Sequence, residues 1–132
     1  MIPKFRAYDG GSLSRMYQPE DVMVGGGNIW INDEDFDAGE WIVNNDLELM
    51  QSTGLHDKNG QEIFEGDVVR QVRTQPTTEN ETITGVVTML EGAWSIVDDN
   101  KQLASVLWSE TAENEIIGNI YENPQLLEGE EK

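Results

Sequence analysis

The 132-residue sequence contains no cysteine and only one histidine, and these absences remove several kinds of site. Without cysteine the chain cannot form disulfides, thiolate-ligated zinc sites or thiol nucleophiles. Lysine and arginine together number only 8, a poor supply for binding phosphates or nucleic-acid backbones. No apolar run approaches the roughly 18 residues of a membrane span, and the first residues lack the apolar segment of a signal peptide. We therefore expect a soluble intracellular protein without a membrane or nucleic-acid partner.

Acidic residues dominate what is present, because 26 Asp and Glu give a formal net charge of −18 and a pI of about 4.1. High charge can signal disorder, but 37% of the residues are hydrophobic and aromatic side chains run from Phe5 to Tyr121. We predict one folded domain over residues 1–127, with an N-terminal β-hairpin part (1–50) and a barrel part (51–127). Residues 128–132 are predicted to form a disordered acidic tail.

Short alternating segments predict a mainly β (α+β) fold with little helix. Residues 4–8 and 13–17 are typical of a first hairpin, and residues 29–31 and 41–43 of a second one. Between the two predicted hairpins, residues 25–27 are three consecutive glycines, which we interpret as a flexible joint.

Four or five short strands between residues 66 and 121 favour a small, SH3-like antiparallel barrel. Gly66-Asp67 precedes its first strand, and Glu91-Gly92 is a tight turn before the strand that contains Trp94, which we expect in the core. Residues 109–113 are predicted to form a loop or one helical turn. Asn123 followed by Pro124 predicts a short C-terminal helix.

Residues 51–69 read QSTGLHDKNGQEIFEGDVV, which resembles the signature of the YopX family of phage and prophage proteins. The opening IPKFRAYD (2–9) and the closing IIGNIYENPQLL (116–127) resemble that family in the same order, whereas residues 25–39 and the loop 75–81 depart from it. The resemblance implies a phage or prophage origin, action in the cytoplasm of a bacterial host, a mainly β fold and self-association. It implies no catalytic residues, so no activity is transferred.

The residues that we expect to be structural within these motifs are mostly turn formers. Asn59-Gly60 accommodates positive φ, and Asp67 is expected to cap the turn into the next strand. The full set of expected structural residues is Gly54, Asp57, Asn59, Gly60, Gly66, Asp67, Gly118, Asn119, Tyr121 and Pro124.

Three groups of polar residues could carry chemistry. The acidic loop with Asp33, Asp35 and Asp37 could hold a divalent ion weakly, but the Gly and Glu that a calcium loop needs are Ala38 and Asn44. His56 is not accompanied by a nucleophile motif, so a catalytic role for it is disfavoured. The carboxylates of Glu62, Glu65 and Asp67 could perform acid–base catalysis, but a structural role in a turn explains them equally well. We predict no catalytic residue, no cofactor and no metal, and we expect His56 to be a partly exposed loop residue.

The tryptophan residues and the uneven distribution of acidic residues suggest a protein partner. Without a basic groove a base-stacking platform is disfavoured, so we interpret Trp30, Trp41 and Trp108 as possible interface residues. Residues 16–57 contain ten acids and no lysine or arginine, and residues 102–131 contain seven acids and again none. We predict a non-enzymatic protein-binding or self-associating module. The alternative is an acidic inhibitor or DNA mimic of a basic host protein, and a carboxylate-based metal-dependent hydrolase is the least favoured hypothesis.

Overall fold

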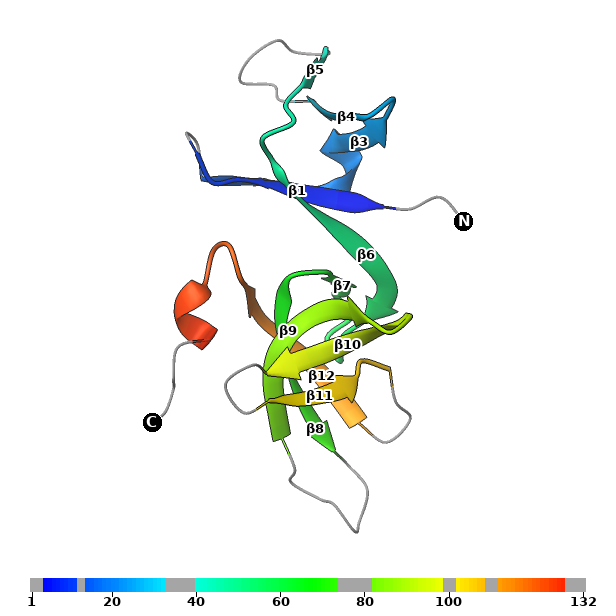
Figure 1. The fold of residues 1–132 in the computed structure, drawn as a ribbon, viewed down its shortest axis with the longest axis vertical. Helices are drawn as coiled ribbons and strands as arrows, with labels where there is room; N and C mark the ends of the chain where they lie inside the picture. The colour runs from blue at the N-terminus through cyan, green and yellow to red at the C-terminus, as the bar shows by residue number, and fades with distance from the viewer. Residues whose placement is uncertain are drawn as a thin grey trace. The chain divides into compact units, whose positions relative to one another are not determined.

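The computed structural model describes residues 4–11, 14–32, 40–73, 82–98, 102–108 and 112–127, and these form a mainly β chain (Figure 1). The chain consists of two compact units, residues 1–52 and residues 53–132. Within the described ranges no helix is long and apolar enough to cross a membrane. The predicted acidic tail, the loop 75–81 and the candidate ion ligands Asp33, Asp35 and Asp37 lie outside the described residues.

The first unit begins with the predicted hairpin, which the structure confirms. Strand β1 (Phe5–Asp9) pairs antiparallel with β2 (Arg15–Tyr17) on one side. On its other side β1 pairs with the first half of β6 (Glu48–His56). The carboxylate of Asp9 accepts the Gly11 N–H at 2.9 Å, which fixes the start of the turn after β1.

A second sheet of the first unit contains β3 (Val22–Gly25), β4 (Asn28–Asn32) and β5 (Trp41–Val43), in that order. The predicted hairpin between β4 and β5 is confirmed by its antiparallel register. The interpretation of the glycine run as a flexible joint is wrong, because Gly26 and Gly27 form the tight turn between β3 and β4. Their φ angles of +61° and +80° are the left-handed values that a two-residue hairpin turn requires.

Both sheets of the first unit contribute to one apolar core, since its buried side chains come from β1, β2, β3, β4 and the residue that precedes β6. These buried residues are Ala7, Tyr17, Val22, Ile31 and Leu47. On the three-stranded sheet the alternation of side chains directs Val22 and Ile31 inward, and the directly paired Ile42 packs against the same cluster.

Strand β6 is longer than the sequence predicts. We expected a loop at His56, but the strand continues to this residue, and Gly54 takes a φ of +79° inside it. The second half of β6 precedes β7 (Glu62–Phe64), which is its neighbour in the sheet order β2-β1-β6-β7. Because only glycine tolerates this φ without strain, Gly54 allows the strand to pass through an irregular point.

The second unit is built on a five-stranded antiparallel sheet with the order β11-β10-β9-β8-β12. Its strands are β8 (Asp67–Arg73), β9 (Thr82–Leu90), β10 (Ala93–Asp98), β11 (Leu103–Val106) and β12 (Ala112–Asn119). The sheet curves around a core of Ile63, Val69, Val87, Ile96 and Leu107 (Figure 1). Trp94, which we expected in the core, is half-buried and packs against the buried cluster. Residues 112 and 113 belong to β12 rather than to a loop or helical turn.

The predicted short C-terminal helix is a single 3₁₀ turn, η3 (Pro124–Leu127). The Leu126 N–H donates to the Asn123 carbonyl at 3.0 Å, which is the i to i+3 spacing of a 3₁₀ turn. Four residues are too few for an α-helix to form repeated i to i+4 bonds. The other described helical element, η1 (Pro19–Asp21), is also a 3₁₀ turn.

Candidate functional site

The Asp57 carboxylate is the centre of the motif in residues 54–60. Its Oδ1 atom accepts the backbone N–H groups of Asn59 and Gln61, each at 2.9 Å, so it holds the turn between β6 and β7. Its Oδ2 atom accepts the N–H of Ile116 at 3.0 Å, which ties that turn to β12. Gly60 completes the turn with a φ of +85°. This buried side chain therefore joins segments 59 residues apart.

The environment of Asp57 favours its ionised form. Burial raises the pKa of this carboxyl, but the three backbone N–H donors of Ile116, Gln61 and Asn59 outweigh burial and hold the pKa below its ordinary value. The neighbouring His56 lowers the pKa further through its charge. Asp57 is thus a structural acceptor whose oxygen atoms are already engaged by backbone.

A cleft of about 500 Å³ lies beside this turn, between the end of β6 and the start of β12. Its walls include His56, Lys58, Trp108, Glu113 and Asn114. His56 is exposed at the end of β6, in a strand rather than in the loop that we expected. The described lining carries no hydroxyl or thiol, and no group of three His, Asp or Glu side chains among the described residues is arranged to hold a metal.

The motif Gly66-Asp67 forms the turn into β8, as expected. Gly66 takes a φ of +90°; its N–H donates to the Val87 carbonyl, and its own carbonyl accepts the Ile120 N–H, both at 2.9 Å. The buried Asp67 carboxylate accepts the Phe64 N–H at 2.8 Å across the turn. Glu62 and Glu65 on either side are only half-buried. The geometry accounts for Asp67 as a turn acceptor.

The closing motif is a second turn organised by one amide. The Oδ1 atom of Asn119 accepts the N–H groups of Tyr121 at 3.0 Å and Glu122 at 2.8 Å. Its Nδ2 atom donates to the Glu122 carboxylate at 2.8 Å. Gly118 permits this packing, because an added Cβ would lie 2.6 Å from Asn123 Oδ1. Pro124 then starts η3.

Sequence reasoning missed Gln71, whose side chain is fully buried in β8. Its Nε2 atom donates to the Val106 carbonyl at 3.1 Å and to Asn114 Oδ1 at 3.0 Å, while its Oε1 atom accepts the Ser105 hydroxyl at 2.7 Å. Asn114 also donates to the Leu107 carbonyl at 2.8 Å. These side-chain amides connect β11 and β12, the two ends of the five-stranded sheet. A polar residue two positions after Val69, and hence on the same inward face, is the signal that could have found it.

An ion cluster lies on the exposed side of β8 and β12. Arg70 donates to the Glu115 carboxylate at 2.9 Å, and the Lys58 ammonium lies 3.9 Å from the same oxygen. The hydrogen bond from Arg70 and the charge of Lys58 hold the pKa of Glu115 below its ordinary value. Because these side chains are exposed, water screens the pairing.

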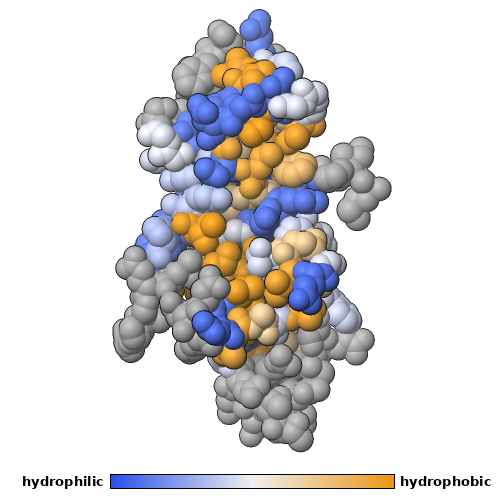
Figure 2. Space-filling model, in the orientation of Figure 1, coloured by the Kyte–Doolittle hydropathy of each residue, from blue (hydrophilic) through white to orange (hydrophobic). Residues whose placement is uncertain are grey.

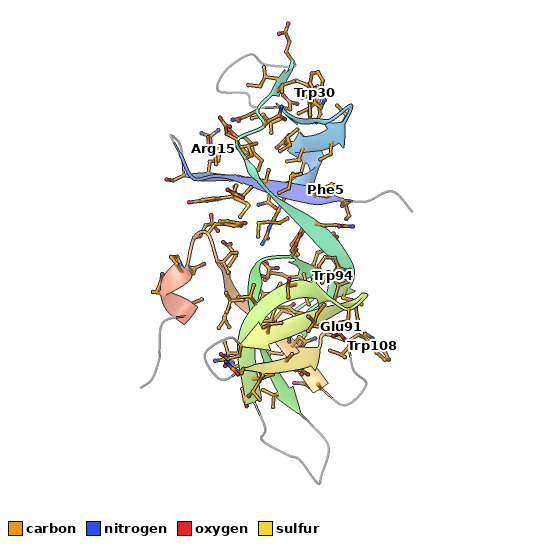
Figure 3. All side chains as sticks on the ribbon, viewed as in Figure 1. Phe5, Arg15, Trp30, Glu91, Trp94 and Trp108 are labelled. Carbon is orange, nitrogen blue, oxygen red and sulfur yellow. The ribbon has the colours of Figure 1, made fainter. Side chains whose placement is uncertain are left out.

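The outer face of the three-stranded sheet in the first unit is apolar. Met23, Trp30 and Val43 are directly paired across β3, β4 and β5, so they share the face opposite to Val22 and Ile31. Trp41 lies two residues from Val43 and therefore on the same face. The position of Trp30 is labelled in Figure 3. We call the set Met23, Trp30, Trp41 and Val43 the tryptophan face.

The tryptophan face is accessible. The exposed fractions of Met23, Val43 and Trp41 are 47%, 44% and 37%, whereas Trp30 is half-buried and donates its indole N–H to the Gly25 carbonyl at 3.3 Å. In Figure 2, hydrophobic and hydrophilic surface alternate over the part of the molecule that contains β3, β4 and β5. The structure thus brings together Trp30 and Trp41, two of the three tryptophans predicted for an interface.

Trp108, the third predicted interface residue, belongs to the second unit. It follows β11, and its side chain is labelled in Figure 3. It lines the cleft beside Asp57 and is 59% exposed. Other exposed apolar residues of this unit are divided between the faces of its sheet. Met89 and Leu90 are adjacent in β9, and Leu103 and Val106 are three apart in β11, so each pair points to opposite faces.

Comparisons with known proteins identify the family of the chain. No curated protein matches the chain. The crystal structure of YopX from Bacillus subtilis is similar with a TM-score of 0.66 and 20% identity, and the similarity covers 96% of each chain. The crystal structure of protein EF1440 from Enterococcus faecalis is similar with a TM-score of 0.56 and 28% identity, over 97% of this chain and 99% of that one. The family model of YopX protein matches residues 4–128, and the chain therefore belongs to the YopX family.

Proposed function

We propose that the protein is a non-enzymatic protein-binding β module that engages its partner through the tryptophan face. The observation that carries this proposal is the direct pairing of Met23, Trp30 and Val43 on the outer face of one sheet. An antiparallel sheet with one face on the core ordinarily presents polar side chains on the other. Methionine and aromatic residues are enriched in protein interfaces, which favours a binding role for this exception.

The signature residues support a scaffold role for the second unit. Asp57, Asp67 and Asn119 all direct side-chain oxygens to backbone N–H groups of turns. A carboxylate or amide that is occupied in this way stabilises local structure rather than acting on a substrate. The proposal includes an SH3-like barrel for this unit and, from the family resemblance, a phage or prophage accessory role in a bacterial host cytoplasm.

The test compares two tryptophan variants that lie in different units. Trp41→Ser alters the tryptophan face, and Trp108→Ser is the matched control with an exposed tryptophan elsewhere. Proteins retained from a bacterial lysate are identified by mass spectrometry, and self-association is measured by sedimentation velocity. We expect the bound protein, or the self-associated species, to be lost with Trp41→Ser and kept with Trp108→Ser. A wild-type monomer that retains no protein, or equal behaviour of both variants, would contradict the proposal.

A second candidate function is an acidic inhibitor that occupies a basic host DNA-binding protein. The specific observation is charge: residues 1–52 contain 10 Asp and Glu against 3 Lys and Arg, a net charge of −7. Attraction between exposed charges would dominate such binding, and salt screens these charges. The affinity should therefore fall strongly as ionic strength rises. A partner retained equally at low and moderate salt would exclude this candidate while leaving the binding module in place.

A further inference from the structure

We infer that the tryptophan face binds a partner segment that carries arginine or lysine between apolar residues, rather than a second copy of this chain. The inference rests on the proposed function, because it names the occupant of the same surface. Two observations carry it: the charges at one end of the sheet, and the small extent of the face.

The carboxylates lie at the Trp41 end of the sheet. Asp21 directly precedes Val22 of β3, and Glu40 directly precedes Trp41 of β5. Since Val22 pairs with Ile31 and Asn32 pairs with Trp41, both acidic residues belong to the same end of the three strands. No lysine or arginine occurs from residue 16 to residue 57, so the strands themselves supply no cation.

The combination of tryptophan rings and nearby carboxylates is complementary to a cationic partner. A guanidinium or ammonium group gains from the face of an indole ring, best for arginine on tryptophan, and carboxylates at the same end of the sheet attract it. Apolar side chains on the same partner segment would cover Met23 and Val43. In an extended segment, alternate residues point to one side, so cations and apolar groups can be matched separately.

A second copy fits this surface poorly. The strands β3, β4 and β5 contain four, five and three residues, and only alternate residues face outward. A stable interface usually needs about 800 Å² and about 20 residues from each partner, more than this face offers. Two copies would also bring together chains that each carry a net charge of −18. A basic segment removes that repulsion and needs less area.

The test uses the full chain and a short synthetic peptide in which arginine alternates with leucine. One control peptide replaces arginine with glutamate, and another replaces leucine with glycine. Binding is measured by calorimetry at about 0.15 M salt, where exposed charges more than about 8 Å apart are largely screened. We expect the arginine–leucine peptide to bind, and both control peptides to bind at least about tenfold more weakly. Trp41→Ser should weaken binding by about tenfold, and Trp108→Ser should leave it unchanged.

Each other outcome has a distinct meaning. Equal binding of the arginine–glycine peptide, or equal effects of the two tryptophan variants, would show non-specific adhesion to an acidic chain and would overturn the inference. Failure of the peptide to bind, together with self-association that Trp41→Ser abolishes, would overturn the inference but leave the proposed function standing. Failure of the peptide to bind a chain that also retains no lysate protein and stays monomeric would overturn both.

Discussion

The two units of the chain differ in where they place polar and apolar side chains. Among the described residues, the polar or charged residues that are buried as a whole belong to the second unit: Asp57, Asp67, Gln71, Ser95 and Asn119. In the described part of the first unit only single polar side-chain atoms are buried, among them Arg6 Nε and Asn32 Oδ1. The buried cluster of the first unit is made of apolar residues and a tyrosine. That unit instead exposes Met23, Trp41 and Val43 together on one sheet face, and Val24 alone on the other. The second unit also exposes apolar residues, but on opposite faces of its strands.

This difference suggests a division of labour. In the second unit, buried acceptors fix turns and strand ends, and a buried polar group that loses its partner is costly, so the local geometry is specified closely. In the first unit, apolar surface remains available after the core is complete. Apolar side chains gathered on one sheet face of a strongly charged chain are the kind of feature that marks a binding site.

Replacement of Gln71 should cause the largest loss of stability. Gln71→Leu keeps a similar volume but leaves the Ser105 hydroxyl, the Val106 carbonyl and Asn114 Oδ1 without their amide partner. We expect the free energy of unfolding to fall by about 3 kcal/mol in urea titrations, because buried polar groups lose their hydrogen bonds. The control is Gln61→Leu, whose exposed side chain should change it by less than about 0.5 kcal/mol. Similar losses for the two variants would show that the buried amide adds no particular stability to the second unit.

Replacement of Asp57 should have the next largest effect. Asp57→Ala removes the acceptor for the N–H groups of Asn59, Gln61 and Ile116. We expect a loss of about 2 kcal/mol in the free energy of unfolding, together with faster amide hydrogen exchange at those three positions. Unchanged exchange at Ile116 would show that the carboxylate does not tie the turn to β12.

The depressed pKa of Asp57 predicts a dependence of stability on pH. The folded state binds this proton less readily than the unfolded state, whose pKa is about 3.9. The contribution is therefore complete above about pH 4 and is lost as the pH falls through the folded pKa. Asp57→Asn removes this titration, so its free energy of unfolding should fall less than that of the wild type between about pH 4 and pH 2. Parallel curves for the two proteins would contradict the prediction.

The smallest effect on stability is expected at the tryptophan face. Trp41 is exposed and lies outside the core cluster, so Trp41→Ser should change the free energy of unfolding by less than about 0.5 kcal/mol. Thermal or urea unfolding, followed by far-ultraviolet circular dichroism, measures this change. A loss comparable to that of Asp57→Ala would mean that Trp41 is structural, and the contrast between the units would then fail.

The sequence predicts the parts of the fold that local chemistry determines. Alternation indicates the hairpins, and Asn59-Gly60 and Gly66-Asp67 indicate turns, because positive φ and side-chain capping leave marks in the residue types. The glycines at 26 and 27 were misinterpreted because a glycine pair is compatible with both a flexible joint and a tight hairpin turn. Only the pairing of β3 with β4 decides between these possibilities.

The candidate site was predictable only in part, for a related reason. Trp30 and Trp41 could be proposed for an interface from their residue type, but their common face depends on strand register. Met23 was not proposed, since its strand was not recognised. Asp57 also contacts Ile116, which is distant from it in sequence. The amide contacts of Gln71 likewise join distant segments. Long-range partners of this kind leave no periodic pattern in the chain.

The most direct test of the account is a map of the backbone amides that respond to the arginine–leucine peptide. Two-dimensional ¹H–¹⁵N NMR spectra of the full chain, recorded as the peptide is added, provide this map. We expect shift changes confined to β3, β4 and β5, with the amides of β8 and β12 unchanged. Changes spread over both units, or centred on the cleft beside Asp57 and Trp108, would contradict it.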